Sequence, residues 1–249
     1  MKSLLHRRKH FISSGGWDLS ANTVAQYLCN DNLETTVVLD VEGTNGTAST
    51  DTDNLHVAGK VGTGAFDFTA ASTESVNCNQ TFQTTIRSAN TFSCWIKPND
   101  GQPAAFQFVF GSVETGVKNY FQLALLSTGK LIVYFRSNGN IMSAETSSAV
   151  FADGATSWTH VLFTVSATAI VIYINGSSVG VTGGDTTGLT LADYTNTKNM
   201  YLGARNNAGS IANYFDGVID DFRVMDKVTT QAEINGIYND GDGTEAQSG

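Results

Sequence analysis

Residues 170–176 read Ile-Val-Ile-Tyr-Ile-Asn-Gly, and Ser178-Val179 follows shortly after them. The first five side chains are β-branched or aromatic, which favours an extended strand. Asn-Gly supplies the two positive φ angles of a type I′ turn, so this stretch predicts a tight antiparallel hairpin. Residues 131–141 have the same arrangement, with an apolar run that leads into Asn138-Gly139.

Short apolar runs alternate with turn residues from Val24 to Met225, and several of them alternate apolar with polar side chains. No segment of helical period and helical length interrupts them, which argues against an α/β fold. We therefore expect an all-β chain folded as a two-sheet antiparallel jelly-roll sandwich. One short C-terminal helix is predicted at Thr230-Gln-Ala-Glu233, which forms a capping box, with Gly241 as its stop.

The composition fits a single large β domain. The chain has 249 residues, of which 41% are hydrophobic and 15% charged, whereas an average globular protein has a charged share of about 25%. No apolar run reaches the roughly 18 residues of a membrane span, so we expect no membrane partner. The predicted divisions are a basic N-terminal arm over 1–20, the jelly roll over 21–241 and a polar tail over 242–249.

The charges are distributed unevenly along the chain. The net charge is −9, yet four of the 14 basic residues, Lys2, Arg7, Arg8 and Lys9, lie in the first ten positions, where no acid occurs. An acidic body argues against nucleic acid as its partner. The arm should instead bind neighbouring protein subunits. A solvated basic tail is the alternative, and RNA or DNA contact by the arm is a lesser option.

The N-terminus lacks the pattern of a secretory signal. Leu4-Leu5 is followed at once by a run of basic residues, whereas a signal needs an apolar stretch of about 7–15 residues. The three cysteines, Cys29, Cys78 and Cys94, form no C-x-x-C pair and are expected to be free thiols. We therefore expect a protein made in the cytoplasm without a signal peptide.

Five motifs occur along the chain in a characteristic order. They are Val24–Leu28 with Val41–Thr47, Gly59–Gly62 with Ala65–Phe68, Phe92–Lys97, Trp158–Val161 with Ile172–Gly176, and Phe215–Val224 with Thr230–Ile234. In this order they resemble the laminin-G-like branch of the concanavalin A-like lectin/glucanase superfamily, over about residues 24–241. The resemblance implies the jelly-roll fold that the hairpins predict.

The resemblance also implies one structural calcium ion between an N-terminal acidic loop and the closing strand. The matching oxygen ligands are Asp40, Glu42, Asn45, Asp220 and Asp221, and calcium prefers carboxylate and carbonyl oxygens. The loop departs from the family's Asp-x-Ser-Gly-Asn-Gly pattern, since it reads Asp-Val-Glu-Gly-Thr-Asn-Gly. A solvated acidic loop is the alternative.

Asp220 and Asp221 are adjacent in the closing strand. In a regular strand Asp220 shares one face with Phe222, and Asp221 shares the other with Ile219. One aspartate should then turn toward the interior, where a buried carboxylate needs a partner. That partner is either a metal ion or a set of backbone amides.

No catalytic arrangement is evident in the sequence. Retaining glucanases of this fold pair two acids about 5 Å apart, whereas the glutamates here are isolated from one another, and His160 is interpreted as a packing residue. We therefore expect no enzymatic activity. Sugar binding is indicated by aromatic, amide and guanidinium groups in the loops, although ordinary loop composition explains them equally well. These candidates are Tyr194, Asn196, Arg205, Asn206 and Tyr214.

Three functions stay open at this point. The first is a virion surface component, such as a capsid decoration, fibre or tail protein, anchored through residues 1–20. A free-standing glycan-binding module (a lectin or adhesin) is the second, and a glycoside hydrolase is the third. We favour the first, because a short chain with a basic arm and no signal peptide suits a particle that leaves the cell by lysis.

Overall fold

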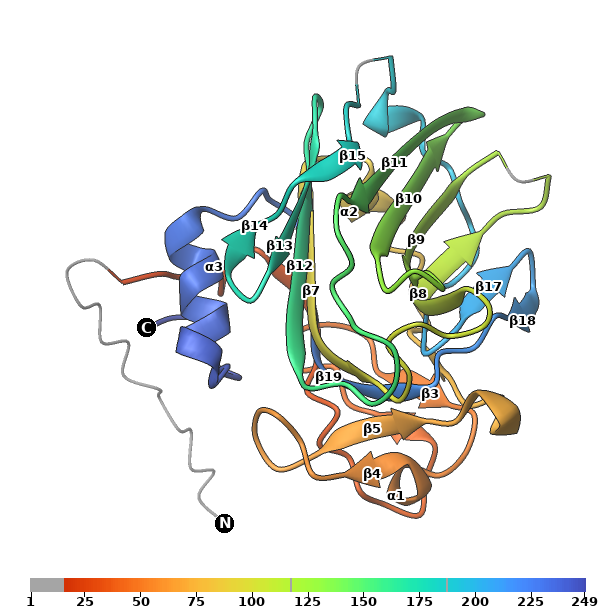
Figure 1. Cartoon of the computed structure of the whole chain (residues 1–249), viewed down its shortest axis with the longest axis vertical. Coiled ribbons are helices and arrows are strands. Elements are labelled where there is room, and N and C mark those ends of the chain that lie inside the picture. The colour runs from red at the N-terminus through yellow and green to blue at the C-terminus, as the bar shows by residue number, and fades with distance from the viewer. Residues whose placement is uncertain (1–15, 117, 187) are drawn as a thin grey trace, which may run out of the picture.

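The computed structural model describes residues 16–116, 118–186 and 188–249. Two β-sheets pack face to face over these residues, and one helix lies on the outer side of the sandwich (Figure 1). All strand pairs are antiparallel except β8 with β17. The predicted all-β jelly-roll sandwich with a short C-terminal helix is confirmed.

The eight-stranded sheet is built around the long closing strand of the chain. That strand, β19, pairs with β7 along one side and with β5 and β1 along the other. In spatial order the strands are β14 (Ser177–Ser178), β13 (Ile170–Ile174), β12 (Thr159–Val165), β7 (Asn90–Pro98), β19 (Gly217–Met225), β5 (Ala65–Phe68) and β4 (His56–Val57), with β1 (Thr23–Tyr27) beside β19.

The eleven-stranded sheet carries the strands that will matter for the site. In spatial order they are β15 (Val181–Gly183), β11 (Asn140–Thr146), β10 (Leu131–Ser137), β9 (Tyr120–Leu125), β8 (Gln107–Val113), β16 (Tyr201–Leu202), β6 (Val76–Asn77), β3 (Gly46–Ala48) and β2 (Val37–Val38). Beside β8 lie β17 (Arg205–Asn207) and its partner β18 (Ser210–Ala212).

Both predicted Asn-Gly hairpins are present. Asn138 and Gly139 have φ angles of 46° and 92° and join β10 to β11, while Asn175 and Gly176 have φ angles of 50° and 77° and join β13 to β14. Positive φ at both central residues matches the right-handed twist of the flanking strands. The local turn chemistry therefore fixes the register of two strand pairs.

The helices are short. They are α1 (Thr52–Leu55), α2 (Gln83–Ile86) and α3 (Gln231–Tyr238), with 3₁₀ turns at Ala70–Ser72, Leu191–Asp193 and Asn239–Gly241. The predicted capping box is present at the start of α3, where Thr230 N donates to Glu233 Oε2 at 2.7 Å and Glu233 N donates to Thr230 Oγ1 at 3.3 Å. The left-handed cap that ends α3 is Asn239, ahead of the predicted Gly241. None of the described helices is both long enough and apolar enough to cross a membrane.

Aromatic rings fill the space between the two sheets. The ring centroid of Phe92 on β7 lies 5.5 Å from that of Phe110, 4.8 Å from that of Phe121 and 5.7 Å from that of Phe163. Full burial of such a ring contributes roughly 1.5–3 kcal/mol of transfer free energy. The three cysteines are free and buried, as the sequence predicts.

A bulge in β19 changes the predicted alternation of the closing strand. Its pairing with β7 shifts between Asp220 and Arg223, and Asp221 adopts a left-handed φ of 44°. An extra residue at a bulge reverses the side-chain phase beyond it. Ile219 and Phe222 consequently both lie in the core, so the prediction that Phe222 shares a face with Asp220 is wrong.

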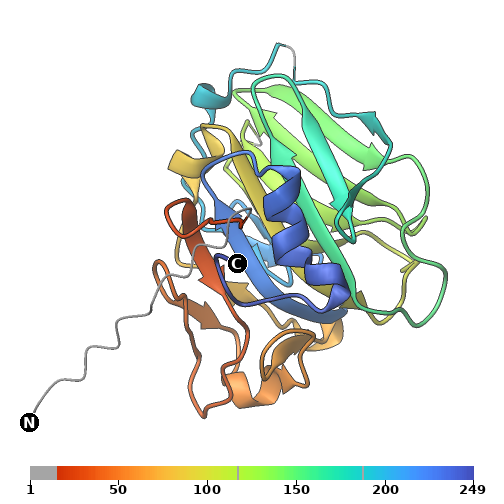
Figure 2. The ribbon, with the colours of Figure 1, turned by 90° about the vertical axis from the view of Figure 1, so that its left-hand side faces the viewer.

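The two ends of the described chain are joined to each other. Trp17 N donates to Gly249 O at 3.1 Å, Gly249 N donates to Trp17 O at 3.0 Å, and Leu19 N donates to Gln247 O at 2.7 Å (Figure 2). Leu19 is buried, and Trp17 packs beside the cluster that holds α3 on the eight-stranded sheet. Residues 17–20 and 242–249 are thus part of the folded body, while Lys2, Arg7, Arg8 and Lys9 lie outside the described residues.

Candidate functional site

The first group of predicted ligands surrounds the carboxylate of Asp40. Its Oδ1 accepts from Gln26 N at 2.8 Å and from Glu42 N at 3.0 Å, and its Oδ2 accepts from Gln80 Nε2 at 3.2 Å. The Asn45 side chain is also engaged, since its Oδ1 accepts from Asp40 N at 3.1 Å. The loop is therefore held together by N–H donors that occupy the oxygens proposed for a cation.

The second group lies on the outer side of the eight-stranded sheet. Asp220 Oδ2 accepts from the backbone N–H groups of Lys60 at 2.7 Å and Val61 at 2.8 Å, and burial raises the pKa of the Asp220 carboxyl to about 7. Asp221 forms an ion pair with Arg223, whose Nη2 lies 2.8 Å from Asp221 Oδ2. Both aspartates are buried, and Asp220 Oδ1 has no hydrogen-bond partner among the described residues.

The five predicted calcium ligands do not fit one shared cation. The charge of Asp221 is neutralised by a guanidinium, and Asp40 and Asp220 accept from N–H groups. Within the described part of the chain, no group of three or more His, Cys, Asp or Glu side chains could hold a metal ion. Calcium binding stays a prediction that rests on the resemblance.

A buried histidine lies in the same sheet. His160 Nε2 lies 3.2 Å from Ser93 Oγ, and its ring centroid is 5.1 Å from that of Trp95. Burial, and secondarily the charge of Arg223, lowers the pKa of His160 to about 3. A neutral, enclosed imidazole of this kind has a packing role.

Three of the five predicted sugar-binding side chains are buried, two in the segment before β16 and one, Asn206, on β17. Tyr194 packs against Phe135 with 5.8 Å between ring centroids. Asn196 Nδ2 donates to Ser112 Oγ at 3.1 Å, and Asn206 Nδ2 donates to the carbonyl of Asn199 at 3.0 Å. The three side chains are buried and packed or hydrogen-bonded within the protein, so they are not available to a ligand in this arrangement.

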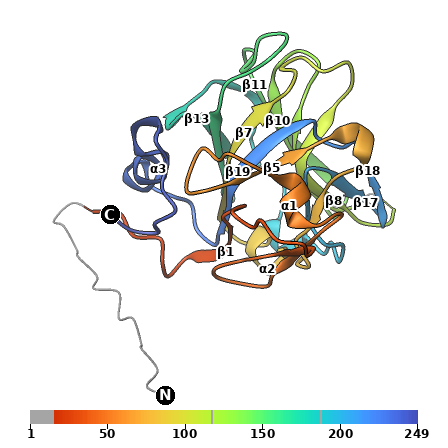
Figure 3. The ribbon, with the colours of Figure 1, turned by 90° about the horizontal axis from the view of Figure 1, so that it is seen from below.

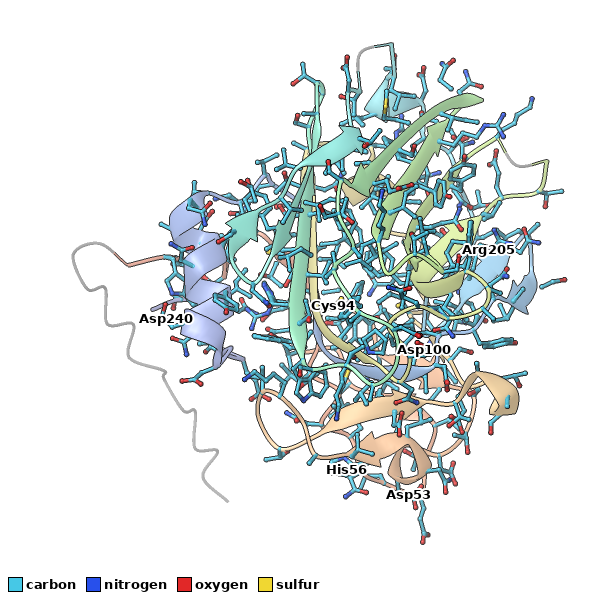
Figure 4. All side chains as sticks on the ribbon, in the orientation of Figure 1. Asp53, His56, Cys94, Asp100, Arg205 and Asp240 are labelled. Atoms are coloured by element: carbon cyan, nitrogen blue, oxygen red, sulfur yellow. The ribbon has the colours of Figure 1, made fainter. Side chains whose placement is uncertain are left out.

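The other two candidates remain accessible at the rim of the eleven-stranded sheet. Arg205 and Tyr214 are each half-buried, and Arg205 Nη2 donates to Asn213 Oδ1 at 2.9 Å. Figure 4 places Arg205 on the side of this sheet that faces away from the eight-stranded sheet, and Figure 3 shows β17 and β18 at the edge opposite α3. Arg205 therefore marks one surface of the sandwich.

That surface is the outer face of the eleven-stranded sheet, and strand alternation decides what it carries. On β9 the core takes Phe121, Leu123 and Leu125. The residues between them, Tyr120, Gln122 and Ala124, must point outward. The register then places Tyr120 opposite Arg136, Gln122 opposite Tyr134 and Ala124 opposite Ile132.

The side chains that point outward form a small apolar patch, with polar groups at its border. Phe108, Ala124, Leu126 and Ile132 pack together, and the ring of Tyr134 lies against them. We call Phe108, Gln122, Tyr134 and Arg205 the outer-face site. The Arg205 guanidinium carbon lies 4.7 Å from the ring centroid of Phe108, and the partly exposed rings of Tyr120 and Tyr134 meet edge to face at 6.4 Å.

Two buried polar atoms of the outer-face site have no hydrogen-bond partner. They are Gln122 Oε1, in a side chain only 3% exposed, and Arg205 Nε. Both side chains flank Gly111, where an added Cβ would lie 3.0 Å from Gln122 Cγ and 3.6 Å from Arg205 Cγ. Since an unsatisfied buried polar group costs about 1–3 kcal/mol, this lone acceptor and lone donor are the groups that a polar ligand would satisfy.

The outer face lacks the acids of a glycosidase. Strands β8, β9, β10 and β17, whose alternate side chains point to the outer face, contain no Asp or Glu. Glu145 on β11 is the acid nearest to them in the register, and its Oε1 is bonded to Lys130 Nζ at 2.9 Å. Retaining hydrolysis needs two free carboxyls about 5 Å apart, and these strands supply none.

Comparison with known proteins gives the family. The sequence profile of the concanavalin A-like lectin/glucanases superfamily matches residues 63–235, which is more than half of the chain. The chain is a member of the concanavalin A-like lectin/glucanase superfamily. The resemblance noted in the sequence is thereby confirmed. No curated protein sequence matches this superfamily member.

Solved structures of the same fold include binding domains and a sialidase. The receptor-binding domain of botulinum neurotoxin C/D mosaic serotype has a TM-score of 0.63 and 16% identity, covering 89% of this chain and 52% of that one. NanB sialidase from Streptococcus pneumoniae has a TM-score of 0.52 and 20% identity, covering 64% of this chain and 25% of the enzyme. A Ruminococcus gnavus sialidase CBM40 bound to α2,3-sialyllactose has a TM-score of 0.50 and 17% identity, covering 61% and 83%.

These identities are too low to transfer a binding mode, so they establish the fold alone. The chain spans a quarter of the NanB enzyme and about half of the neurotoxin receptor-binding domain. In fold, therefore, the chain is similar to a lectin or carbohydrate-binding module. The sequence could not identify Phe108, Gln122 and Tyr134 as site residues, because their proximity depends on which strands pair.

Proposed function

We propose that the protein binds glycans at the outer-face site and is not an enzyme. The observation that carries the proposal is Gln122 Oε1, a buried acceptor without a partner beside the partly exposed ring of Tyr134. Small-molecule sites combine an apolar or aromatic wall with a few placed polar groups. A sugar offers both complements, since its hydroxyl groups donate hydrogen bonds and its C–H face packs on an aromatic ring.

The fold relatives support this proposal without deciding it. One is a receptor-binding domain, and another is a carbohydrate-binding module with a bound sialylated sugar. Strands β8, β9, β10 and β17 contain no acidic side chain, which argues against hydrolysis at the proposed site.

The experiment is a glycan-array screen of the full chain, followed by calorimetric titration of the best ligands. Tyr134→Ala should weaken binding at least roughly tenfold, or about 1.4 kcal/mol, because it removes the exposed ring. Tyr173→Ala is the matched control, since Tyr173 is a partly buried tyrosine packed beside the α3 cluster on the other sheet. The proposal fails if no glycan binds, or if the two variants bind equally well.

A more specific role remains a separate proposal, namely a virion surface component anchored by the N-terminal arm. Its support is the sequence alone: Lys2, Arg7, Arg8 and Lys9 precede an acidic body. Mass spectrometry of purified particles would test it directly. Deleting residues 2–16 would test the anchor, since the truncated chain should no longer be incorporated at full occupancy.

A further inference from the structure

Arg223 and Arg205 are both withdrawn from water to some degree, and their positive charges are compensated differently. Arg223 is fully buried and pairs with Asp221, and its remaining N–H groups donate to the carbonyls of Thr244 and Ala246. Arg205 is half-buried, and its only bond to a side chain runs from Nη2 to the neutral amide of Asn213. No carboxylate pairs with Arg205 among the described residues.

This difference leaves a positive charge without compensation in the outer-face site. Burial lowers the pKa of the Arg205 guanidinium, which shows that its charged form is partly desolvated. A withdrawn charge normally has an opposite charge beside it. The chain has 23 Asp and Glu residues from which a partner could have come, yet Arg205 Nε has none at all.

The Arg205 side chain is also oriented in advance. Its guanidinium packs over the Phe108 ring at 4.7 Å, and the bond to Asn213 fixes one end of the group. A planar guanidinium held on an aromatic face presents its remaining donors at its edge, in the geometry that recognises a carboxylate or sulfate. The nearby Arg136 is engaged elsewhere, since its Nε donates to the carbonyl of Gly139 at 3.1 Å.

We propose that the outer-face site selects acidic glycans, in which a carboxylate or sulfate pairs with Arg205 while a hydroxyl of the same sugar donates to Gln122 Oε1. This inference rests on the proposed function and names the ligand class within it. The two requirements together disfavour a simple anion, which lacks the donor, and a neutral sugar, which leaves the guanidinium uncompensated. Gln122 and Arg205 both lie beside Gly111, which places the two side chains next to each other on this face.

The test uses three ligands that share one core: lactose, sialyllactose and sulfated lactose. Calorimetric titration should give an acidic sugar at least a tenfold lower Kd than lactose, and the preference should shrink as salt rises. Sialyllactose and sulfated lactose distinguish the carboxylate from the sulfate. In Arg205→Gln the Kd for lactose and the Kd for the acidic sugar should become nearly equal. Arg205→Lys should keep part of the preference for the acidic sugar, because the ammonium group keeps the positive charge but loses the paired donors of the guanidinium.

Arg87→Gln is the control variant, since Arg87 is an exposed arginine at the end of α2 and is not one of the four residues of the outer-face site. It should keep the wild-type ratio, and thermal melting checks that each variant is folded. Equal affinity for lactose and both acidic sugars overturns this inference while glycan binding stands. A preference that survives in Arg205→Gln also overturns it. Failure of every sugar on the array overturns the proposed function as well.

Discussion

Replacing Asp221 by Asn should destabilise the protein by about 3–5 kcal/mol, which is the usual cost of removing one partner from a buried ion pair. Neither Asp221 nor Arg223 is more than 1% exposed. The carboxylate accepts three hydrogen bonds from the guanidinium, between 2.8 and 3.1 Å. Asn preserves the size of the side chain and tolerates the left-handed φ of 44° at this bulge, so the measured loss reports the missing charge.

Urea unfolding at pH 7, followed by circular dichroism, measures the effect. Thermal melting gives a second measure of the same loss. At roughly 2 °C per kcal/mol for a chain of this length, the expected fall in Tm is about 6–10 °C. Lys130→Met is the control, because its pair with Glu145 is about 30% exposed and such pairs contribute roughly 0–1 kcal/mol. If Asp221→Asn costs no more than this control, the buried pair is not a stabilising unit and the reasoning is refuted.

Three further predictions concern titration, metal binding and the chain end. The unfolded chain binds a proton at His160 near pH 6.5, whereas the folded chain does so only near pH 3, so the contribution of His160 to the free energy of unfolding should fall by up to about 1.4 kcal/mol per pH unit as pH drops from 6.5 to 3. Asp220, whose pKa is raised to about 7, contributes with the opposite sign as pH falls from 7, so the His160 effect is the difference between the urea-titration profiles of the wild type and His160→Gln, and identical profiles count against this assignment. The resemblance predicts that millimolar calcium raises the Tm and that chelator lowers it, whereas the N–H donors on Asp40 and on Asp220 Oδ2 predict no change; thermal melting with calcium and with chelator decides between the two. Deleting residues 244–249 removes two carbonyl acceptors of Arg223, so thermal melting should show a clear loss of stability, and an unchanged Tm would contradict this.

Elements with a local chemical signal could be predicted from the sequence. The Asn175-Gly176 turn and the Thr230-to-Glu233 capping box need only neighbouring residues, and both are present. The bulge at Asp221 could not be predicted, because it arises from pairing with β7 rather than from the strand's own pattern. Its effect was to reverse the face predicted for Phe222.

The candidate site was only partly predictable for a related reason. Arg205 was identified as a polar loop residue with binding chemistry, but so were Asn196, which bonds to Ser112 on β8, and Asn206, which bonds to the carbonyl of Asn199. Composition cannot distinguish a loop amide that binds a ligand from one that satisfies its own backbone. Gln122 lies in a predicted strand, and its role depends on Gly111 and Arg205, which are remote in sequence.

The paired hydrogen bonds between Trp17 and Gly249 mean that the chain could be reconnected in a different order. With the two ends within hydrogen-bond reach, a linker of a few residues should close residues 17–249 into a ring without disturbing either sheet. New ends could then be opened in the exposed loop at 153–155, since surface loops tolerate such cuts best. In such a circular permutant β19 would no longer be the closing strand of the chain, yet it would keep the same neighbours in space.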